Sequence, residues 1–301
     1  MRQIAAARPC AWCGSRRARL VWVEAGYRYV RCRSCGGVFS DLTESDYERA
    51  RHNVWNEALP DDATVAFYGA ARERAHAEFL DNNPPAGNRR LLDIGCGLGF
   101  FLARAQERGW DVYGVDSSRT WVGHANSLLG AERVEEATVE RASHAPGSLA
   151  LITAWDVIEH IFDPVPFLAH LRTLLAPGGR LFIRTPNLAY VYPVYAVRRW
   201  LLGHDVELGP TNHVVYFTAH TMRDALARAG LRPSNWPALL PPQVALAPNG
   251  RAVRSRREHR IIAAKNGYAR AVGALAGASG GKLVAGGDLD VLCAPADRRC
   301  G

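Results

Sequence analysis

Long apolar runs are missing from this chain of 301 residues. No run approaches the roughly 18 residues that a membrane-spanning helix needs. The first thirty residues also lack the apolar core of a secretion signal, so we expect a cytoplasmic protein. Apolar residues still make up 48% of the chain and charged residues 22%, a balance that excludes a largely disordered or collagen-like chain. The length suits one domain of ordinary size and a small appendage.

Lysine is almost absent: of 37 basic residues only Lys265 and Lys282 are lysines, and the others are arginines. Positive charge gathers in residues 1–40, with eight Arg and one Glu, and in residues 251–270, with six Arg, one Lys and one Glu. The rest of the chain is net negative, although the whole carries +8. The two patches permit a polyanionic partner such as nucleic acid. An arginine excess also follows from GC-rich codon usage, so composition alone predicts no such partner.

Four of the seven cysteines form two C-x2-C pairs, Cys10 with Cys13 and Cys32 with Cys35, separated by 18 residues. This spacing matches a tetrahedral zinc site with four thiolate ligands. Four protein ligands leave no open position, so the metal would be structural. Forty residues bury too little core to fold alone, and zinc binding of roughly 10–16 kcal/mol supplies the difference. We therefore expect a zinc ribbon in residues 1–40, with short strands at 21–23, 27–31 and 38–40.

Strand and helix patterns alternate after a polar stretch at 41–62, which we interpret as a connector. Such alternation predicts an α/β fold with a doubly wound parallel sheet in residues 63–301. An aromatic stretch at 186–212 interrupts the pattern and is expected to form a lid or a wall for a substrate. The expected helices lie at 63–80, from the glycine-rich turn to about 108, and at 119–129, 166–175, 218–229 and 251–276. The expected strands lie at 91–94, 111–115, 133–139, 149–155, 180–184 and 288–294.

A glycine-rich turn runs from Asp93 to Gly99 with glycines at alternate positions. It follows a predicted strand and opens a predicted helix, where glycine lets the backbone approach a ligand closely. A dinucleotide-binding G-x-G-x-x-G would need glycine where Phe100 stands, and no Lys-Ser/Thr follows as in a P-loop. Asp116 closes the next strand, where a carboxylate can accept hydrogen bonds from both hydroxyls of a ribose.

Several blocks in this order resemble class I S-adenosylmethionine-dependent methyltransferases over about residues 63–295: LLDIGCGLGFFL, VYGVDSS, DVIEHIFDP, LLAPGGRLFIRTPN and HVVYFTAHTMRDALARAGL. The resemblance implies a Rossmann-like seven-stranded sheet whose last strand is antiparallel, with S-adenosylmethionine as cofactor. It also implies the cofactor-binding residues. The motif that begins at Asp93 would bring Gly95, Gly97 and Gly99 against the methionine part, Asp116 would hold the ribose, and Thr138 and Val139 would lie beside adenine.

Two departures from the family pattern concern the adenine end of the site. Many relatives carry an acidic residue near Thr138, so a hydroxyl or the backbone must replace it here. Many also read Phe-Asp before the fourth strand, where this chain has Leu149-Ala150. Neither departure touches the methyl-donor end, so we expect weaker affinity rather than lost activity.

Asp156, Glu159 and His160 follow the fourth strand, at the edge where open α/β sheets bind ligands. A helical turn would put these three side chains on one face. His213 lies in the segment that follows the fifth strand. Two carboxylates and two imidazoles could hold a second, divalent metal, a set similar to that of small-RNA 2′-O-methyltransferases and resembling quinone O-methyltransferases. The metal would orient a hydroxyl and lower its pKa. Without metal, His160 or His213 is the candidate general base, and helix capping or packing is the remaining interpretation.

These features predict methyl transfer to a hydroxyl, less surely a carbon, of a small molecule such as a sugar, a secondary metabolite or a lipid-linked intermediate. Zinc-ribbon modules precede this domain in sugar-modifying methyltransferases of natural-product pathways, which favours that acceptor class. The first alternative is an RNA methyltransferase that binds through residues 1–40 and 251–270. The second is a cofactor-binding regulator without catalysis. Residues 191–202 could also contact a membrane surface peripherally.

Overall fold

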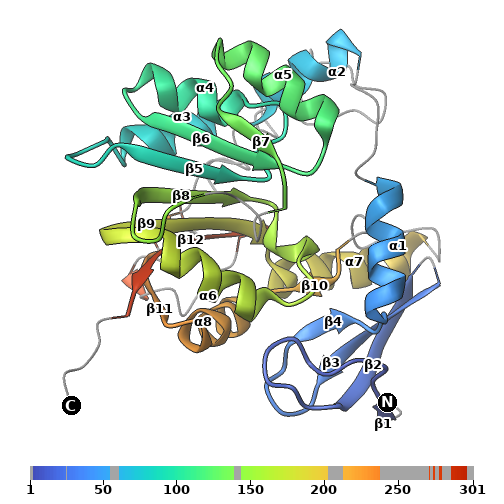
Figure 1. Ribbon diagram of the computed structural model, residues 1–301. Coiled ribbons are helices and arrows are strands. Elements are labelled where there is room, and N and C mark those ends of the chain that lie inside the picture. Colours follow the sequence, from blue (N-terminus) through green and yellow to red (C-terminus); the bar gives the residue numbers. More distant parts are fainter. Residues whose placement is uncertain are drawn as a thin grey trace, which may run out of the picture.

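The computed structural model describes residues 3–24, 26–54, 61–138, 144–202, 213–237 and 286–296, with positions 271, 274, 278 and 279. In these residues a central mixed sheet carries helices on both faces, and a smaller antiparallel sheet lies beside it (Figure 1). The predicted helix at 251–276 and residue Val139 lie outside the described residues, apart from isolated positions between 271 and 276. No helix in the described part of the chain is long and apolar enough to cross a membrane.

The central sheet has the predicted Rossmann-like order. Its parallel strands are β5 (Arg90–Ile94), β6 (Asp111–Asp116), β7 (Val134–Glu136), β8 (Leu149–Trp155) and β9 (Leu175–Pro186). The last strand, β12 (Asp288–Pro295), runs antiparallel to β9 and to β11 (Leu231–Asn235). The order β11-β12-β9-β8-β5-β6-β7 confirms the predicted sheet with its antiparallel last strand.

Side chains alternate between the two faces of this sheet and build two helical layers. Leu91 and Leu151 pack with helices α3 (Glu73–Asp81), α4 (Phe100–Glu107) and α5 (Arg119–Leu129). Their chain neighbours Leu92 and Ile152 pack on the opposite face with α6 (Pro164–Leu174) and α8 (Ala219–Arg228). This alternation follows from the two-residue period of a strand. Both faces of the central strands are therefore buried, as a parallel sheet requires.

Both ends of helix α8 follow the predicted capping signals, whereas the helix predicted at 63–80 is divided in two. Thr218 caps α8 through a reciprocal capping box with Thr221, and Gly230 follows the helix at φ +73°. The helix expected at 63–80 is instead two helices, α2 (Asp62–Ala71) and α3. Arg72 separates them with φ −115° and ψ 5°. The interruption matters because Arg72 reaches the site described below.

The smaller sheet contains β1 (Gln3–Ala5), β2 (Arg17–Glu24), β3 (Tyr27–Cys32) and β4 (Val38–Ser40). The three strands predicted in residues 1–40 lie within β2, β3 and β4. A fifth strand, β10 (Val215–Tyr216), pairs antiparallel with β4 and comes from the distant part of the chain. Trp12 and Phe39 share one buried cluster with Ile158 and Phe217, so the N-terminal module and the central sheet have a continuous core.

Two segments differ from or extend the sequence interpretation. The stretch 41–62 contains helix α1 (Glu44–Val54), where only a polar connector was expected. Glu44 and Asp46 lie in its first turn, where carboxylates stabilise the positive end of a helix. The aromatic segment 186–212 contains helix α7 (Leu188–Leu202), and residues 203–212 lie outside the described part.

Candidate active site

A cleft of about 740 Å³ opens at the carboxyl ends of β5, β6 and β8. This volume is within the usual range of small-molecule sites. Ligands bind at this edge in open α/β sheets because the loops after successive strands converge there. The cleft is lined by Glu44, Tyr47, Glu48, Arg72, Ile94, Gly95, Val115, Asp116, Ser117, Trp121, Ala137, Thr138, Trp155, Asp156, Val157, His160, Ile161, Phe162, Asp163, Pro166, Phe167 and His170.

The glycine turn between β5 and α4 has a backbone that other residues adopt only under strain. Gly95, Gly97 and Gly99 have φ of +63°, +55° and +83°, in the left-handed region. A Cβ on Gly95 would lie 2.7 Å from a methyl carbon of Val157, and one on Gly99 would lie 2.8 Å from the Cβ of Ala125. The turn therefore leaves no room for side chains at these two positions.

Asp116 lies at the end of β6 and is fixed by the backbone around it. Its Oδ2 accepts the Gly97 N–H at 2.9 Å, and its Oδ1 accepts the Ser118 N–H at 2.9 Å. Burial raises the pKa of Asp116, while these N–H donors counteract the rise. A carboxylate has about four acceptor positions, so each oxygen can accept one further hydrogen bond. Asp116 lines the cleft and is thus arranged to accept two ligand hydroxyls.

The other residues predicted to bind the cofactor take different positions. Asp93 is buried beneath the turn rather than in the cleft wall, and its Oδ1 accepts the Thr153 hydroxyl at 2.6 Å. Burial raises the pKa of Asp93 to about 8. Thr138 lines the cleft beyond β7, whereas Gly97 and Gly99 support the turn without lining it. Trp121 also lines the cleft. Its only sequence signal is its position shortly after the block VYGVDSS.

Asp156 lies in the part of the cleft wall that follows β8 and has an unusual backbone. Its φ is +54°, a left-handed value found at no other non-glycine residue of the described chain. Its carboxylate pairs with the guanidinium of Arg72 from the junction of α2 and α3. Left-handed backbone at a non-glycine residue costs on the order of 1–3 kcal/mol and is concentrated at functional sites. Both partners line the cleft.

Glu159, His160 and His213 come together behind and beside this wall. Glu159 Oε2 accepts the Thr185 hydroxyl at 2.9 Å, and its Oε1 lies 4.0 Å from His213 Nε2. The rings of His160 and His213 are 4.8 Å apart. Burial raises the pKa of Glu159 well above its ordinary value and lowers the pKa of His213 to about 3. His213 is therefore neutral near pH 7, and burial favours the neutral form of Glu159. Of the three residues, His160 alone lines the cleft.

The four-residue arrangement expected after β8 does not form. A 3-10 turn, η2 (Ile158–His160), replaces the helical turn that would align Asp156 with Glu159 and His160. Glu159, His160 and His213 offer ligand atoms within 4.8 Å of one another, and Asp156 is outside this group. Its left-handed backbone and its ion pair with Arg72 turn the carboxylate elsewhere.

Helix α1 supplies a wall that sequence reasoning missed. Glu44, Tyr47 and Glu48 line the cleft. The Tyr47 hydroxyl donates to the carbonyl of His160 at 2.8 Å, and its ring lies 5.0 Å from that of Phe162. The polar sequence of this segment carries no motif that would place it at a site.

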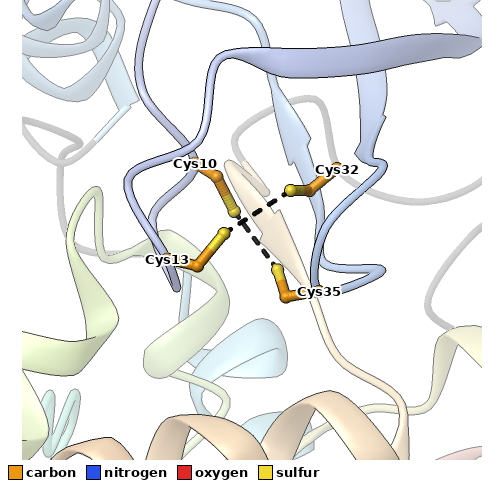
Figure 2. A group of neighbouring side chains, drawn as sticks. All are labelled: Cys10, Cys13, Cys32 and Cys35. Atoms are coloured by element: carbon orange, nitrogen blue, oxygen red, sulfur yellow. Dashed lines mark hydrogen bonds between the residues drawn. The ribbon is translucent and has the colours of Figure 1, made fainter.

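The four predicted zinc ligands converge in the N-terminal module (Figure 2). The Sγ atoms of Cys10 and Cys35 are 3.5 Å apart, and those of Cys13 and Cys32 are 3.6 Å apart. Thiolates on a tetrahedral zinc with Zn–S bonds of ~2.3 Å would be about 3.8 Å apart. A left-handed glycine follows each C-x2-C pair, Gly14 at φ +71° and Gly36 at +80°. The arrangement fits a closed, four-thiolate metal site.

The fold and this cleft define a methyltransferase domain, and comparison with known proteins agrees. The family model described as "Methyltransferase domain" matches residues 66–234, more than half of the chain. The chain therefore belongs to this methyltransferase family.

Curated relatives include ubiquinone biosynthesis O-methyltransferases. The protein of Aeromonas salmonicida is 36% identical over 104 residues, which cover 33% of this chain and 44% of the relative. That of Parvibaculum lavamentivorans is 32% identical over 171 residues, covering 54% and 67%. The chain spans about half the length of the first such relatives.

Solved structures share the fold at lower identity. A chain from the complex of the Haloferax volcanii Trm112 methyltransferase activator with a methyltransferase has a TM-score of 0.52 at 15% identity, covering 79% of this chain and 97% of that one. An S-adenosylmethionine-dependent methyltransferase of Mesorhizobium loti has a TM-score of 0.50 at 19% identity, covering 75% and 99%. These likenesses show the fold.

Proposed function

We propose that the protein is an S-adenosylmethionine-dependent methyltransferase acting on a hydroxyl of a small molecule, with a carbon atom as the second candidate acceptor. The observation that carries this proposal is Asp116, anchored by the Gly97 and Ser118 amides in the wall of the cleft beside the glycine turn. Membership of the methyltransferase family supports the reaction class. The curated O-methyltransferase relatives support a small-molecule acceptor.

On the donor side, the chain would bind and orient S-adenosylmethionine, which supplies an electrophilic methyl group on a sulfonium. Asp116 would accept hydrogen bonds from the two ribose hydroxyls through the lone pairs that its backbone partners leave open. Gly95 lets the cofactor approach the backbone, because a side chain there would fill the space beside Val157. Thr138 would lie near the adenine, and Asp93 would stiffen the turn from beneath through Thr153.

On the acceptor side, His160 would act as the general base because it is the imidazole of the buried group that lines the cleft. It would accept the proton of the acceptor hydroxyl as the oxygen forms its bond to the methyl carbon and the sulfur–carbon bond breaks. The products are the methylated acceptor and S-adenosylhomocysteine. General-base catalysis of this kind contributes ~10²–10⁴-fold. His213 and Glu159, both buried, would hold the position of the His160 ring.

A divalent metal at Glu159, His160 and His213 is the alternative form of the same proposal. Two observations fit it: Glu159 Oε1 and His213 Nδ1 are buried and have no hydrogen-bond partner among the described residues. Asp156 would not take part, because it pairs with Arg72. The metal would supply a Lewis acid for the acceptor hydroxyl. Chelation that leaves the cysteine-bound metal in place should abolish turnover under this form and leave turnover unchanged when His160 is the base.

The four cysteines would hold a structural zinc ion, since four thiolates close the coordination shell. Their side chains fit the ion, and the module shares its core with the methyltransferase domain. We also propose the domain division 1–40, 41–62 and 63–301. These boundaries describe units of the sequence, because strand β10 of the third unit pairs with β4 of the first. The cytoplasmic location remains a prediction from the sequence.

Helix α7 supports peripheral contact with a membrane surface, which a lipid-linked acceptor would require. Its exposed large side chains are Tyr190, Val194, Val197 and Trp200, and the indole of Trp200 is 83% exposed. An interfacial tryptophan on an apolar helix face is typical of contact with lipid head groups. Co-sedimentation with anionic vesicles should therefore retain the wild-type chain better than the Trp200→Ala variant.

The experiment that tests the function is transfer of labelled methyl from S-adenosylmethionine into a cell extract, followed by fractionation. Label in small, nuclease-resistant or solvent-extractable material supports the small-molecule proposal. Label in nuclease-sensitive polymer would instead favour the RNA methyltransferase, whose basic segment 251–270 lies outside the described residues. Binding of S-adenosylhomocysteine without transfer to any fraction would favour a regulator.

A further inference from the structure

Arg8 is a buried charge that the proposed reaction does not use. It precedes the first cysteine pair by two residues and is 4% exposed. Its guanidinium donates to the carbonyl of Phe162 at 2.6 Å and lies 3.6 Å from the centroid of the Phe162 ring. Phe39 of β4 lies on its other side, at 5.3 Å. Phe162 belongs to the cleft wall, so a side chain of the N-terminal module reaches the candidate active site from behind.

Burying the charged side chain of Arg8 costs free energy that an apolar side chain at the same position would not cost. Its Nη1 has no hydrogen-bond partner among the described residues. A buried cation whose closest partners are a carbonyl and two rings stabilises less than an apolar side chain of similar volume would. The contribution of Arg8 is therefore better explained by the position in which it holds Phe162 than by a gain in stability.

Arg8 is one of three donors that hold the carbonyls of residues 159, 160 and 162 in the loop carrying His160. The Val214 N–H, beside strand β10, donates to the carbonyl of Glu159 at 2.8 Å. The Tyr47 hydroxyl of α1 donates to the carbonyl of His160 at 2.8 Å. Arg8 then donates to Phe162. Val214 is itself tied to the module, because its carbonyl accepts the Ser40 N–H at 2.9 Å.

In the described part of the chain, the hydrogen bonds that hold the donor side of the cleft come from the central sheet and its glycine turn. The glycine turn and Asp116 are held by one another and by β6: the Gly95 N–H donates to the Val115 carbonyl at 2.8 Å, and the Gly97 N–H donates to Asp116. The hydrogen bonds that hold the two sides of the cleft thus come from different parts of the chain. A change in the N-terminal module should therefore disturb the structure of the acceptor side of the cleft before that of the donor side.

We propose that Arg8 is a positioning residue: it fixes the Phe162 wall and, with Tyr47, the loop that presents His160 to the acceptor. The inference rests on the proposed function, since the loop matters only if an acceptor is methylated beside it. It gives the four-cysteine module a role in acceptor geometry rather than in cofactor binding. Loss of its metal would then disturb the acceptor side while the donor side persists.

The test compares Arg8→Met, Arg8→Lys and the control Arg17→Met in the full-length chain. Arg17 is an exposed arginine on β2 of the same module, so the control removes a charge without touching the loop. Hydrogen exchange is followed in residues 156–163, where the amides of His160 and Ile161 donate within η2 at 2.9 and 3.2 Å. Arg8→Met should speed exchange there at least tenfold and leave exchange of residues 90–108 unchanged. Arg8→Lys, which keeps a charged donor, should restore part of the protection.

Two further readouts separate positioning from loss of folding and from failure of the proposed function. Calorimetric binding of S-adenosylhomocysteine and the metal content should stay within twofold of wild type in Arg8→Met, whereas methyl transfer into the acceptor fraction should fall at least tenfold. Tyr47→Phe, which removes one hydroxyl, should give a smaller effect in the same direction. Unchanged exchange in 156–163, or an equal increase in 90–108, would overturn the role of Arg8. Exchange does not need an acceptor, so it decides this question even if wild type transfers no methyl.

Discussion

Replacement of Asp116 gives the most direct control over donor binding. The carboxylate keeps one acceptor position on each oxygen after the Gly97 and Ser118 amides are satisfied at 2.9 Å each. A charge-assisted hydrogen bond contributes roughly 1.5–3 kcal/mol, and each 1.4 kcal/mol is about tenfold in affinity. Asp116→Asn keeps one acceptor oxygen and should weaken binding by ~10–100-fold. Asp116→Ala loses both ribose contacts and should weaken it by ~10²–10⁴-fold.

Calorimetric titration with S-adenosylhomocysteine measures this effect without an acceptor. Asp111→Asn is the matched control, because Asp111 begins the same strand β6 but pairs with Arg133 outside the cleft. The control should change affinity by less than about twofold, far below the ~1.5 kcal/mol of a single charge-assisted bond. If Asp116→Ala binds within twofold of wild type while remaining folded, the assignment of the ribose to Asp116 is wrong.

Three further predictions concern the metal, the turn and pH. Metal analysis should find one zinc per chain, lost together with the fold of the N-terminal module when Cys10 and Cys13 become serine; a zinc-free, fully folded wild type would refute the ribbon. Gly95→Ala should weaken S-adenosylhomocysteine binding tenfold or more, because its Cβ would lie in a left-handed backbone within 2.7 Å of a valine methyl. Gly123→Ala, with no atom within 4 Å of its Cβ, should retain full affinity, and equal losses in both would contradict the argument. Burial lowers the pKa of His76 well below 6.5, so the unfolded chain binds a proton that the folded chain excludes. The stability of wild type relative to His76→Phe should therefore fall by up to about 1.4 kcal/mol per pH unit below pH 6.5. Urea unfolding at pH 7.5 and 5.5 measures it, and a pH-independent difference would count against a neutral, buried His76.

Local sequence patterns predicted the central sheet and the metal module well. Strand β5, the glycine turn and Asp116 follow from apolar runs and from the positions where only glycine fits. The four cysteines converge as their spacing predicts, because each C-x2-C turn needs only the glycine that follows it. Strand β11 was missed since it contains Pro233, which lacks an N–H and is tolerated at the edge of a sheet.

The parts of the site that escaped prediction depend on tertiary contacts. The pairing of Arg72 with Asp156 needs the break between α2 and α3 and a left-handed backbone at an aspartate, neither of which has a clear sequence signal. Strand β10 is two residues long and pairs with β4, about 175 residues earlier in the chain. The wall formed by Tyr47 comes from a polar helix whose position is set by what it packs against.

The measurement that tests the central claim most directly is the stoichiometry of the reaction with the acceptor fraction. Labelled methyl incorporated and S-adenosylhomocysteine released are counted together for wild type and for Asp116→Ala. We predict equal amounts of both products from wild type and a loss of both in the variant at limiting S-adenosylmethionine. Tight binding of S-adenosylhomocysteine by wild type, with neither product formed from any fraction, would contradict the assignment of this chain as a methyltransferase.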